Sequence, residues 1–382
     1  VHQTSKEVRL AKKNKKAKWN KKSEYTPFPP PQQPRKIDIQ METGEYFLNE
    51  KIKEKKKILE KEEKEIEKRK IKKEEKLKEF IPPKEENIKI KNIKNIKNEE
   101  GENKEELIER VTGANKGIGY GIVRGLAQQL NGATIYLTAR NPTLGQAAVQ
   151  QLQKELGDKK KSEVIFHQLD ITDENSCKKL VEYLREKFGG LDVLINNAGI
   201  AFKQSDTEPP SIQADITIGI NYYGTKSISN VLIPLIRKGG RIVNVCSQIG
   251  EMNGSYCKYK KELVDRFRDI PALKVSDIDQ FVEDYKKLAE EDRRKEGGYP
   301  ESAYGVSKAA EIALTMLQAH ELGSKGITVN ACCPGYVDTD MSSHKGHLTI
   351  DEGADTPIWL ATAEGVPNGA FVYLRKAIEW LH

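Results

Sequence analysis

Tyr304 and Lys308 are the residues of this sequence whose types and spacing could do chemistry together. A spacing of four residues puts them on one face of a helix, one turn apart. A neighbouring ammonium favours the phenolate over the phenol, so it lowers the tyrosine pKa from about 10 toward neutral pH. Such a phenol can give a proton to a carbonyl oxygen that is receiving a hydride.

The same Tyr-x-x-x-Lys spacing occurs three more times, so the pair alone identifies no site. The other copies are Tyr183/Lys187, Tyr222/Lys226 and Tyr256/Lys260. They lie, in that order, on a charged helix, on a crossover helix and in a lysine-rich stretch. Tyr304 instead begins a long helix between two predicted strands, so that its side chain can face a strand end. We therefore predict that Tyr304 and Lys308 form the catalytic pair.

The elements that must position this pair begin near Val111, where apolar runs start to alternate with amphipathic helices. Helices are predicted up to about residue 130, over 144–156 and over 175–188. Strands are predicted over 133–139, 163–167, 191–195, 240–247 and 326–331. Strands that alternate with helices indicate an α/β fold with a doubly wound parallel sheet.

A glycine-rich turn at 112–119 precedes the first helix of this region. Glycines let the backbone approach a pyrophosphate, and a helix N-terminus offers free N–H groups and the positive end of its dipole. We therefore predict that this turn binds a dinucleotide cofactor through Gly113, Asn115, Lys116, Gly117, Ile118 and Gly119.

Polar residues at the ends of the later strands extend this predicted cofactor site. Arg140 stands where an NAD-selective domain usually carries an acid, and together with Lys116 it favours a 2′-phosphate, hence NADPH. Each cation taken singly is equally an ordinary surface charge. Asp170 could accept a hydrogen bond from the adenine amine. The remaining predicted cofactor residues are Asn197, Ala198, Gly199, Tyr304, Lys308, Pro334, Gly335, Val337 and Thr339.

The catalytic and substrate residues are predicted around the end of the fifth strand. Ser247 ends that strand, and Asn221 lies on the preceding helix; both join Tyr304 and Lys308 in the catalytic set. Ser247, Ile249, Tyr336 and Met341 are predicted to line the substrate pocket. No metal site is predicted.

Residues 111–382 resemble the short-chain dehydrogenases/reductases, and within them the monomeric NADPH-dependent carbonyl reductases. The general resemblance rests on the turn at 112–119, on Asn196-Asn197-Ala198-Gly199, on Ser247 and on Tyr304/Lys308. The closer resemblance rests on Thr138-Ala139-Arg140, on the segments 145–152 and 166–170, and on Asn330-Ala331-Cys332-Cys333-Pro334-Gly335. A long stretch between Ser247 and Tyr304, with an insertion at about 251–300, is a further sign.

The resemblance implies a Rossmann-type fold and the reduction of a ketone, aldehyde or quinone by NADPH. Ser247 and Tyr304 would hydrogen-bond the carbonyl oxygen, and Tyr304 would donate the proton. Lys308 would hold the nicotinamide ribose, and Asn221 would anchor a water that relays protons to Lys308. The insertion would cover the helices that other members use to form tetramers, which implies a monomer. Cys332 and Cys333 resemble a pair near the substrate entrance, or are simply buried thiols.

The first hundred residues differ in composition from the rest of the chain. They carry a net charge of +11, whereas the remainder carries −4. Their long lysine and glutamate runs cannot bury enough surface to offset the entropy of ordering, so residues 1–103 are predicted to form a disordered or single-helix tail. Residues 5–90, with Tyr25 to Gln32 and Gly44 to Leu48, resemble the region after the KH domains of a ribosomal-RNA-processing protein. That implies a docking or targeting tail with weak RNA or pre-ribosome contact.

The number and spacing of the cysteines and the hydropathy of the chain indicate in which cellular compartment the protein is expected. Five cysteines without scaffold spacing suit free thiols in a reducing environment. No apolar run reaches the ~18 residues of a membrane helix, and the start of the chain lacks a signal-peptide core. We predict a soluble cytoplasmic protein without membrane contact, or a nuclear or nucleolar one if the tail directs it there.

The stretch before the glycine-rich turn departs from the pattern. The central strand of such a sheet should be a continuous apolar run, but Lys104 to Val111 reads Lys-Glu-Glu-Leu-Ile-Glu-Arg-Val. Buried charges at Glu109 and Arg110 would cost several kcal/mol unless paired. We interpret this as a tail joined to a domain (104–382) at about residue 110, with a degenerate first strand. Two interpretations stay open: an active or weakened carbonyl reductase, and an inactive reductase-like domain on an RNA-associated tail.

Overall fold

The computed structural model describes residues 107–203 and 206–382, which form one sheet with helices on both faces. The tail predicted over residues 1–103, with its resemblance to an RNA-processing protein, lies outside the described residues. The strand order is β3-β2-β1-β4-β5-β6-β7-β8, and every neighbouring pair is parallel except β7 with β8. The predicted doubly wound parallel sheet is therefore confirmed.

Strands β2 to β6 coincide with the predicted ones to within a few residues, whereas β7 and β8 were not predicted. Their bounds are β1 Ile108–Val111, β2 Thr134–Ala139, β3 Glu163–Gln168, β4 Leu191–Asn196, β5 Ile236–Val245, β6 Thr328–Cys333, β7 Phe371–Tyr373 and β8 Lys376–Ile378.

Helices connect these strands. The α-helices are α4 Gly117–Gln129, α5 Pro142–Leu156, α6 Glu174–Phe188, α7 Pro210–Ile218, α8 Thr225–Leu232, α9 Lys261–Asp265, α10 Val275–Glu290, α11 Ala303–Gly323 and α12 Ile350–Thr362. Short turns are η3 Gly157–Lys159, η4 Gly219–Gly224 (a π-helical turn between α7 and α8), η5 Ile233–Leu235 and η6 Gln248–Gly250.

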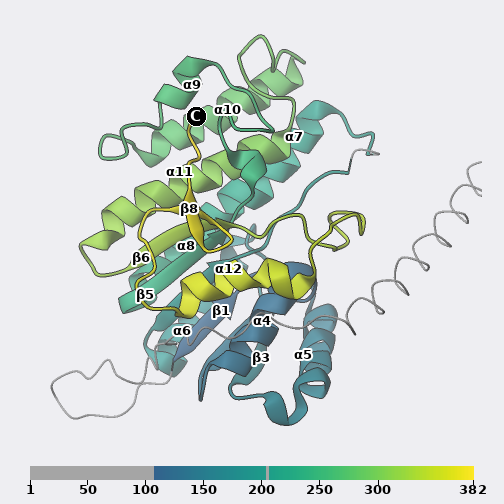
Figure 1. The fold of residues 1–382 in the computed structure, drawn as a ribbon, viewed down its shortest axis with the longest axis vertical. Coiled ribbons are helices and arrows are strands. Elements are labelled where there is room, and N and C mark those ends of the chain that lie inside the picture. The colour runs from purple at the N-terminus through teal and green to yellow at the C-terminus, as the bar shows by residue number, and fades with distance from the viewer. Residues whose placement is uncertain (1–106, 204–205) are drawn as a thin grey trace, which may run out of the picture. The chain divides into compact units, whose positions relative to one another are not determined.

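Two helical layers cover the sheet (Figure 1). One apolar cluster joins α4, α5 and α12 to one face, and a second joins α6 and α8 to the other. Helix α11 lies over that second face, and all but a few of its residues are buried. Because both faces are covered, almost every residue of β2, β4 and β6 is buried.

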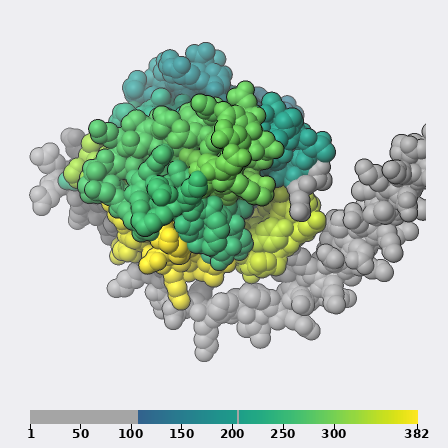
Figure 2. Space-filling view, turned by 90° about the horizontal axis from the view of Figure 1, so that it is seen from above, coloured from purple at the N-terminus to yellow at the C-terminus, as the bar shows by residue number. Residues whose placement is uncertain are grey.

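The insertion between β5 and α11 contains α9 and α10, and it packs on α7 and α11. Its own core includes the rings of Phe267, Phe281 and Tyr285, which belong to the same apolar cluster as Val306 and Ile312 of α11. An ion pair of 2.6 Å between Lys226 of α8 and Asp279 of α10 adds a polar link. Figure 2 shows this segment as the broad green surface of the viewed face. The insertion therefore covers α7 and part of α11.

Strand β1 forms at the centre of the sheet despite its charged residues. It pairs with β2 on one side and with β4 on the other, and the Asp192 carboxylate accepts a 2.7 Å hydrogen bond from Ile108 N. Glu109 and Arg110 are completely buried, and their charged atoms have no hydrogen-bond partner within the described residues. Side chains alternate along a strand, so the two charges lie on opposite faces of the sheet.

Burial perturbs both groups in the direction that disfavours their charge. It raises the pKa of Glu109 to about 8, with Asp192 adding to the effect and Arg241 opposing it. It lowers the pKa of Arg110 to about 9. An acid whose pKa is higher in the fold than in the unfolded chain loses stability as the pH rises between the two values. For Glu109 that range runs from about pH 4.5 to 8.

Replacing either charge by an apolar side chain of similar shape should therefore stabilise the fold. We expect Glu109→Met and Arg110→Met each to raise the free energy of unfolding by about 1 to 4 kcal/mol at pH 8. Denaturant unfolding followed by circular dichroism measures the change.

Glu186→Met on the exposed face of α6 is the matched control, and it should change the free energy of unfolding by about 0.5 kcal/mol or less. The gain from Glu109→Met should shrink as the pH falls from 8 to 5. A loss of stability in both β1 variants, or a gain independent of pH for Glu109→Met, would contradict this account of the strand.

Candidate active site

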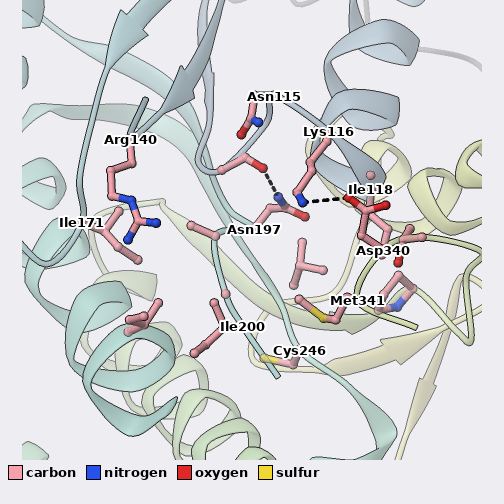
Figure 3. Close-up of a pocket in the computed structure, with 18 of the residues that line it drawn as sticks. Asn115, Lys116, Ile118, Arg140, Ile171, Asn197, Ile200, Cys246, Asp340 and Met341 are labelled. Atoms are coloured by element: carbon pink, nitrogen blue, oxygen red, sulfur yellow. Dashed lines mark hydrogen bonds and ion pairs between the residues drawn. The ribbon is translucent and has the colours of Figure 1, made fainter. Parts of the chain in front are cut away.

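A cavity of about 390 Å³ opens at the carboxyl ends of the central strands (Figure 3). Most of the residues predicted to bind a cofactor line it. These are Gly113, Asn115, Lys116, Gly117, Ile118, Arg140, Asp170, Asn197, Ala198, Gly199, Tyr304, Lys308, Pro334 and Thr339. The topology therefore brings together residues that are more than two hundred positions apart in the sequence.

Three predicted cofactor residues do not line the cavity. Gly119 is buried in α4, where an added Cβ would lie 2.4 Å from the side-chain nitrogen of Asn197. Gly335 has a φ of +82° and turns the chain after β6. Val337 is buried and packs against Gly353. Their contribution to the cavity is therefore to shape its walls.

The glycine-rich turn brings β1, α4 and the end of β4 into close contact. Gly113 has a φ of +60°, and an added Cβ would lie only 2.8 Å from Cα of Ala198. Gly117 also has a positive φ and begins α4. L-amino acids with side chains rarely adopt this conformation, so the turn requires glycine at both positions.

Hydrogen bonds from Thr112 fasten this turn to the end of β4. Its hydroxyl oxygen accepts from the backbone nitrogens of Asn197 and Ala198, both at 2.9 Å. In return, the side-chain nitrogen of Asn197 donates to the carbonyl oxygens of Thr112 and Gly113. The first N–H groups of α4 have no acceptor inside the helix. They face a cavity whose walls these hydrogen bonds hold in place.

Two cations stand on the cavity wall. Arg140 follows β2 and points toward the cavity in Figure 3. Lys116 Nζ lies 2.8 Å from Asp340, which follows β6, and this lysine holds the pKa of Asp340 below its usual range. His344 bonds to Asp338 and to Asp340. Asp170, which follows β3, accepts two hydrogen bonds from Thr172.

Helix α11 carries the predicted catalytic pair into the same cavity. The Ser302 hydroxyl caps the helix by accepting from Gly305 N at 3.0 Å. One turn apart, Tyr304 and Lys308 line the cavity, and Lys308 Nζ lies 5.7 Å from the centre of the Tyr304 ring. The ammonium also donates to the carbonyl oxygen of Val245 at 3.0 Å, at the end of β5.

A buried acid that the sequence analysis did not single out completes this group. Glu311 Oε2 lies 2.6 Å from Lys308 Nζ, and both side chains are almost fully buried. Helix periodicity predicts that residues 308 and 311 are neighbours, which was the available signal. A glutamate in a helix is ordinarily exposed, and its burial here follows from α11 being covered on all sides.

Burial and these charges act on the phenol in opposite directions. Burial raises the pKa of Tyr304, the Lys308 ammonium lowers it, and the Glu311 carboxylate raises it, with a net upward direction. The ammonium thus lowers the tyrosine pKa as predicted, but burial, which the sequence analysis did not include, outweighs it and makes the net direction upward. For Lys308, burial lowers the pKa, but Glu311 and Tyr304 outweigh it and the net direction is upward. The lysine is therefore cationic at neutral pH.

Asn221 lies in the π-helical turn η4, and its amide fixes the chain after β4. The side-chain oxygen accepts from Ile200 N at 2.8 Å, and the nitrogen donates to Ile200 O at 2.9 Å. The same nitrogen donates to the Ser307 hydroxyl of α11 at 3.0 Å. These bonds leave the oxygen one acceptor position.

Ser247, Ile249 and Tyr336, which were predicted to meet the substrate, do not line this cavity, whereas Met341 does. Ser247 directly follows β5, and its hydroxyl accepts from Ile249 N at 3.3 Å at the start of η6. Turn η6 lies against α11, because an added Cβ on Gly250 would lie 2.7 Å from the carbonyl carbon of Lys308. Turn η6, which begins directly after Ser247, therefore lies against the part of α11 that holds Tyr304 and Lys308.

The other three Tyr-x-x-x-Lys pairs lie away from the cavity lining. Lys187 donates to the Tyr183 hydroxyl on α6, the Tyr222 hydroxyl donates to Asp279, and Tyr256 is an exposed loop residue. The cavity also has lining residues that the sequence analysis missed, among them Cys246, Ile171 and Thr172. Cys332 and Cys333 are buried thiols outside the lining.

Within residues 107–203 and 206–382, no group of three or more potential ligands could hold a metal ion. Over the same ranges, no helix has both the length and the hydropathy needed to cross a membrane.

Comparisons with known proteins agree with this geometry. The family model described as short chain dehydrogenase matches residues 109–259 and 294–348. Carbonyl reductase (NADPH) 1 from Bos taurus is 44% identical over 281 residues, which are 71% of this chain and 97% of that protein. The Homo sapiens protein of the same name is 45% identical with the same coverage.

Solved structures give the same result at greater distance. Salutaridine reductase from Papaver somniferum is 31% identical with a TM-score of 0.61, covering 69% of this chain and 99% of that one. Menthone neomenthol reductase from Mentha piperita is 30% identical with a TM-score of 0.58, covering 70% and 98%.

The contact between Gly113 and Ala198 should be indispensable for the shape of the cavity. Gly113→Ala adds both backbone strain and a collision with Ala198, and we expect a loss of stability of about 2 kcal/mol or more. Thermal unfolding measures this loss, and equilibrium dialysis measures dinucleotide binding, which should weaken at least tenfold.

Gly157→Ala is the matched control, since Gly157 shares the positive φ but an added Cβ there meets no atom within 4 Å. Equal losses in the two variants would mean that strain alone matters and that the contact with Ala198 does not.

Proposed function

The chain belongs to the short-chain dehydrogenase family, and from that premise we propose that it reduces the carbonyl group of ketones, aldehydes or quinones with NADPH. One observation carries the proposal. Tyr304 and Lys308 line the same cavity as the glycine-rich turn and the two cations Lys116 and Arg140. A proton donor and a dinucleotide-binding wall therefore face one space.

The residues of the cavity fit NADPH. The start of α4 offers free N–H groups and a positive dipole end to a pyrophosphate. Arg140 and Lys116 supply the charge that a 2′-phosphate requires, and Lys116 would exchange Asp340 for it. Asp170 stands where the adenine would lie, while Asn197 to Gly199 and the residues after β6 would border the rest. The NADPH-dependent relatives support this choice of cofactor.

When bound, NADPH supplies the hydride for the carbonyl carbon. We assign Tyr304 the transfer of its phenolic proton to the carbonyl oxygen, so that an alcohol forms without a free alkoxide. Ser247 would donate a second hydrogen bond to that oxygen, where negative charge grows. A buried phenol with a raised pKa keeps its proton at neutral pH, and this suits the direction of reduction.

Lys308 and Asn221 would act around this donor. The ammonium of Lys308 would hold the nicotinamide ribose and stabilise the phenolate left after proton transfer. Asn221 keeps one acceptor position, and a water bound there would relay protons toward Lys308. For substrate selection, Met341 lies in the cavity lining and is half-exposed, and we assign Ile249 and Tyr336 the outer wall of the pocket.

We further propose that the chain is a monomer. The insertion with α9 and α10 occupies α7 and the face of α11 next to it, which are surfaces that a partner subunit would otherwise need. The docking or RNA-contacting tail remains a prediction from sequence, as does its nuclear or cytoplasmic destination. The competing interpretation, an inactive domain on such a tail, requires that the described domain fail to bind NADPH.

Removing the phenolic hydroxyl tests the proton donor. We expect Tyr304→Phe to lower kcat for quinone or ketone reduction by about 10²- to 10⁴-fold, because no other acid is positioned at the carbonyl oxygen. NADPH oxidation at 340 nm measures turnover, and fluorescence titration measures NADPH binding, which should persist.

Tyr256→Phe provides the matched control, since Tyr256 has the same spacing to a lysine but is exposed. Its turnover should equal that of the unmodified chain. Full activity of Tyr304→Phe would remove this residue from the acid role, and absence of NADPH binding in the unmodified chain would favour the inactive interpretation.

The choice between NADPH and NADH should depend on Arg140. Arg140→Gln removes a charge-assisted hydrogen bond to the 2′-phosphate, and we expect KM for NADPH to rise by about tenfold or more. KM for NADH should stay within about twofold, since NADH has no phosphate there. Arg185→Gln on exposed α6 is the control. An equal rise for both cofactors would place Arg140 outside the phosphate site.

A further inference from the structure

The carboxylate of Glu311 stands beside the catalytic lysine with no access to solvent. Its Oε2 lies 2.6 Å from Lys308 Nζ, and the two side chains are 1% and 5% exposed. The residues are one helical turn apart on α11, so the helix itself holds them together. Neither the family resemblance nor the roles described above assign this acid a function.

Further contacts fix the pair at both ends. Thr225 of α8 donates its hydroxyl to the other carboxylate oxygen, Oε1, at 3.3 Å. Lys308 donates to Val245 O at the end of β5. The ammonium therefore has a carboxylate on one side, a strand-end carbonyl on another, and the Tyr304 ring 5.7 Å away.

Stability alone does not explain a buried ion pair at this position. Moving two charges out of water costs more free energy than an ion pair commonly returns, and apolar replacements of such pairs often stabilise proteins. Lys308 is needed for the proposed chemistry, but an unaccompanied ammonium there would present its whole positive charge to the phenol. A buried carboxylate next to it changes that field.

We propose that Glu311 is a positioning residue of the active site: its carboxylate holds the Lys308 ammonium at the end of β5 and offsets the positive charge that faces Tyr304. The proposal rests on the proposed function in that Tyr304 is taken as the proton donor. Its consequence is that Tyr304 stays protonated to higher pH, which favours carbonyl reduction over alcohol oxidation.

The other titratable groups around the pair carry little charge toward the phenol. The thiols of Cys246 after β5 and of Cys333 on β6 act on the phenol, and burial raises the pKa of both, so they are neutral. Cys332 belongs to the apolar cluster on the other face of the sheet. The charge of Glu251, which follows η6, further raises the pKa of Cys333.

Tyr222 of η4 donates to Asp279 of α10, which is already paired with Lys226. In the described chain, Glu311 is therefore the anionic group with the closest approach to Lys308.

Two substitutions that each remove one negative charge, and a third that keeps it, separate this role from a general effect of charge on the protein. Glu311→Gln keeps the shape and an oxygen that can accept from Lys308, but removes the negative charge. Glu321→Gln makes the same change on an exposed position of the same helix and is the matched control. Glu311→Asp keeps the charge and shortens the side chain.

The pH profile of kcat for ketone reduction gives the first readout. Reduction requires the protonated phenol, so kcat falls as the pH rises through the tyrosine pKa. We expect this alkaline limb to move to lower pH by about one unit or more in Glu311→Gln, and to stay in place in Glu321→Gln and nearly so in Glu311→Asp. A limb unmoved in Glu311→Gln, or moved equally by Glu311→Asp, would overturn the proposal.

A second readout needs neither cofactor nor turnover. The phenolate absorbance near 295 nm, taken as the difference between each chain and its Tyr304→Phe counterpart, follows Tyr304 alone. We expect titration above the ordinary value of about 10 in the unmodified chain and a lower value in Glu311→Gln.

If Glu311→Gln does not fold, the unmodified chain still decides, because titration well below 10 there would overturn the proposal. The expected difference spectra without any turnover would instead reject the proposed function and leave only the effect of Glu311 on the Tyr304 phenol.

Discussion

The site is arranged around one buried positive charge, the ammonium of Lys308. An uncompensated ammonium in a protein interior is costly, so its surroundings must supply partners. The chain supplies the end of β5 through Val245 O, the carboxylate of Glu311 one helical turn away, and the ring of Tyr304. Helix α11 can present these groups together because the sheet covers one side of it and the insertion covers another.

The same sheet places the glycine-rich turn at the cavity that Lys308 also lines. Thr112 and Asn197 tie the glycine-rich turn to the end of β4 through paired hydrogen bonds. The ends of parallel strands meet at one edge of a sheet, so this turn, Arg140 and the start of α11 face a common cavity. Strand β1 occupies the centre of this sheet although it buries two ionisable side chains, Glu109 and Arg110, whose charged forms are disfavoured by desolvation.

Much of this was predictable from sequence where local pattern decides the outcome. The succession of strands and helices, the turn at 112–119 and the placement of Tyr304, rather than the three other tyrosines, at the cavity followed from periodicity and chain order. Features that depend on tertiary burial were not predictable in this way. Glu311 looked like an ordinary helical glutamate, the net direction of the Tyr304 pKa depended on burial, and the unpartnered burial of Glu109 and Arg110 required the completed sheet.

The most direct test of the central claim follows a hydride from the cofactor to the product. The full chain is incubated with a ketone and NADPH deuterated twice at the nicotinamide C4, and the alcohol is analysed by mass spectrometry and NMR. Hydride transfer from NADPH should leave one deuterium on the carbinol carbon and a hydroxyl proton from solvent. Alcohol whose carbinol carbon carries only solvent hydrogen, or no alcohol despite bound NADPH, would contradict it.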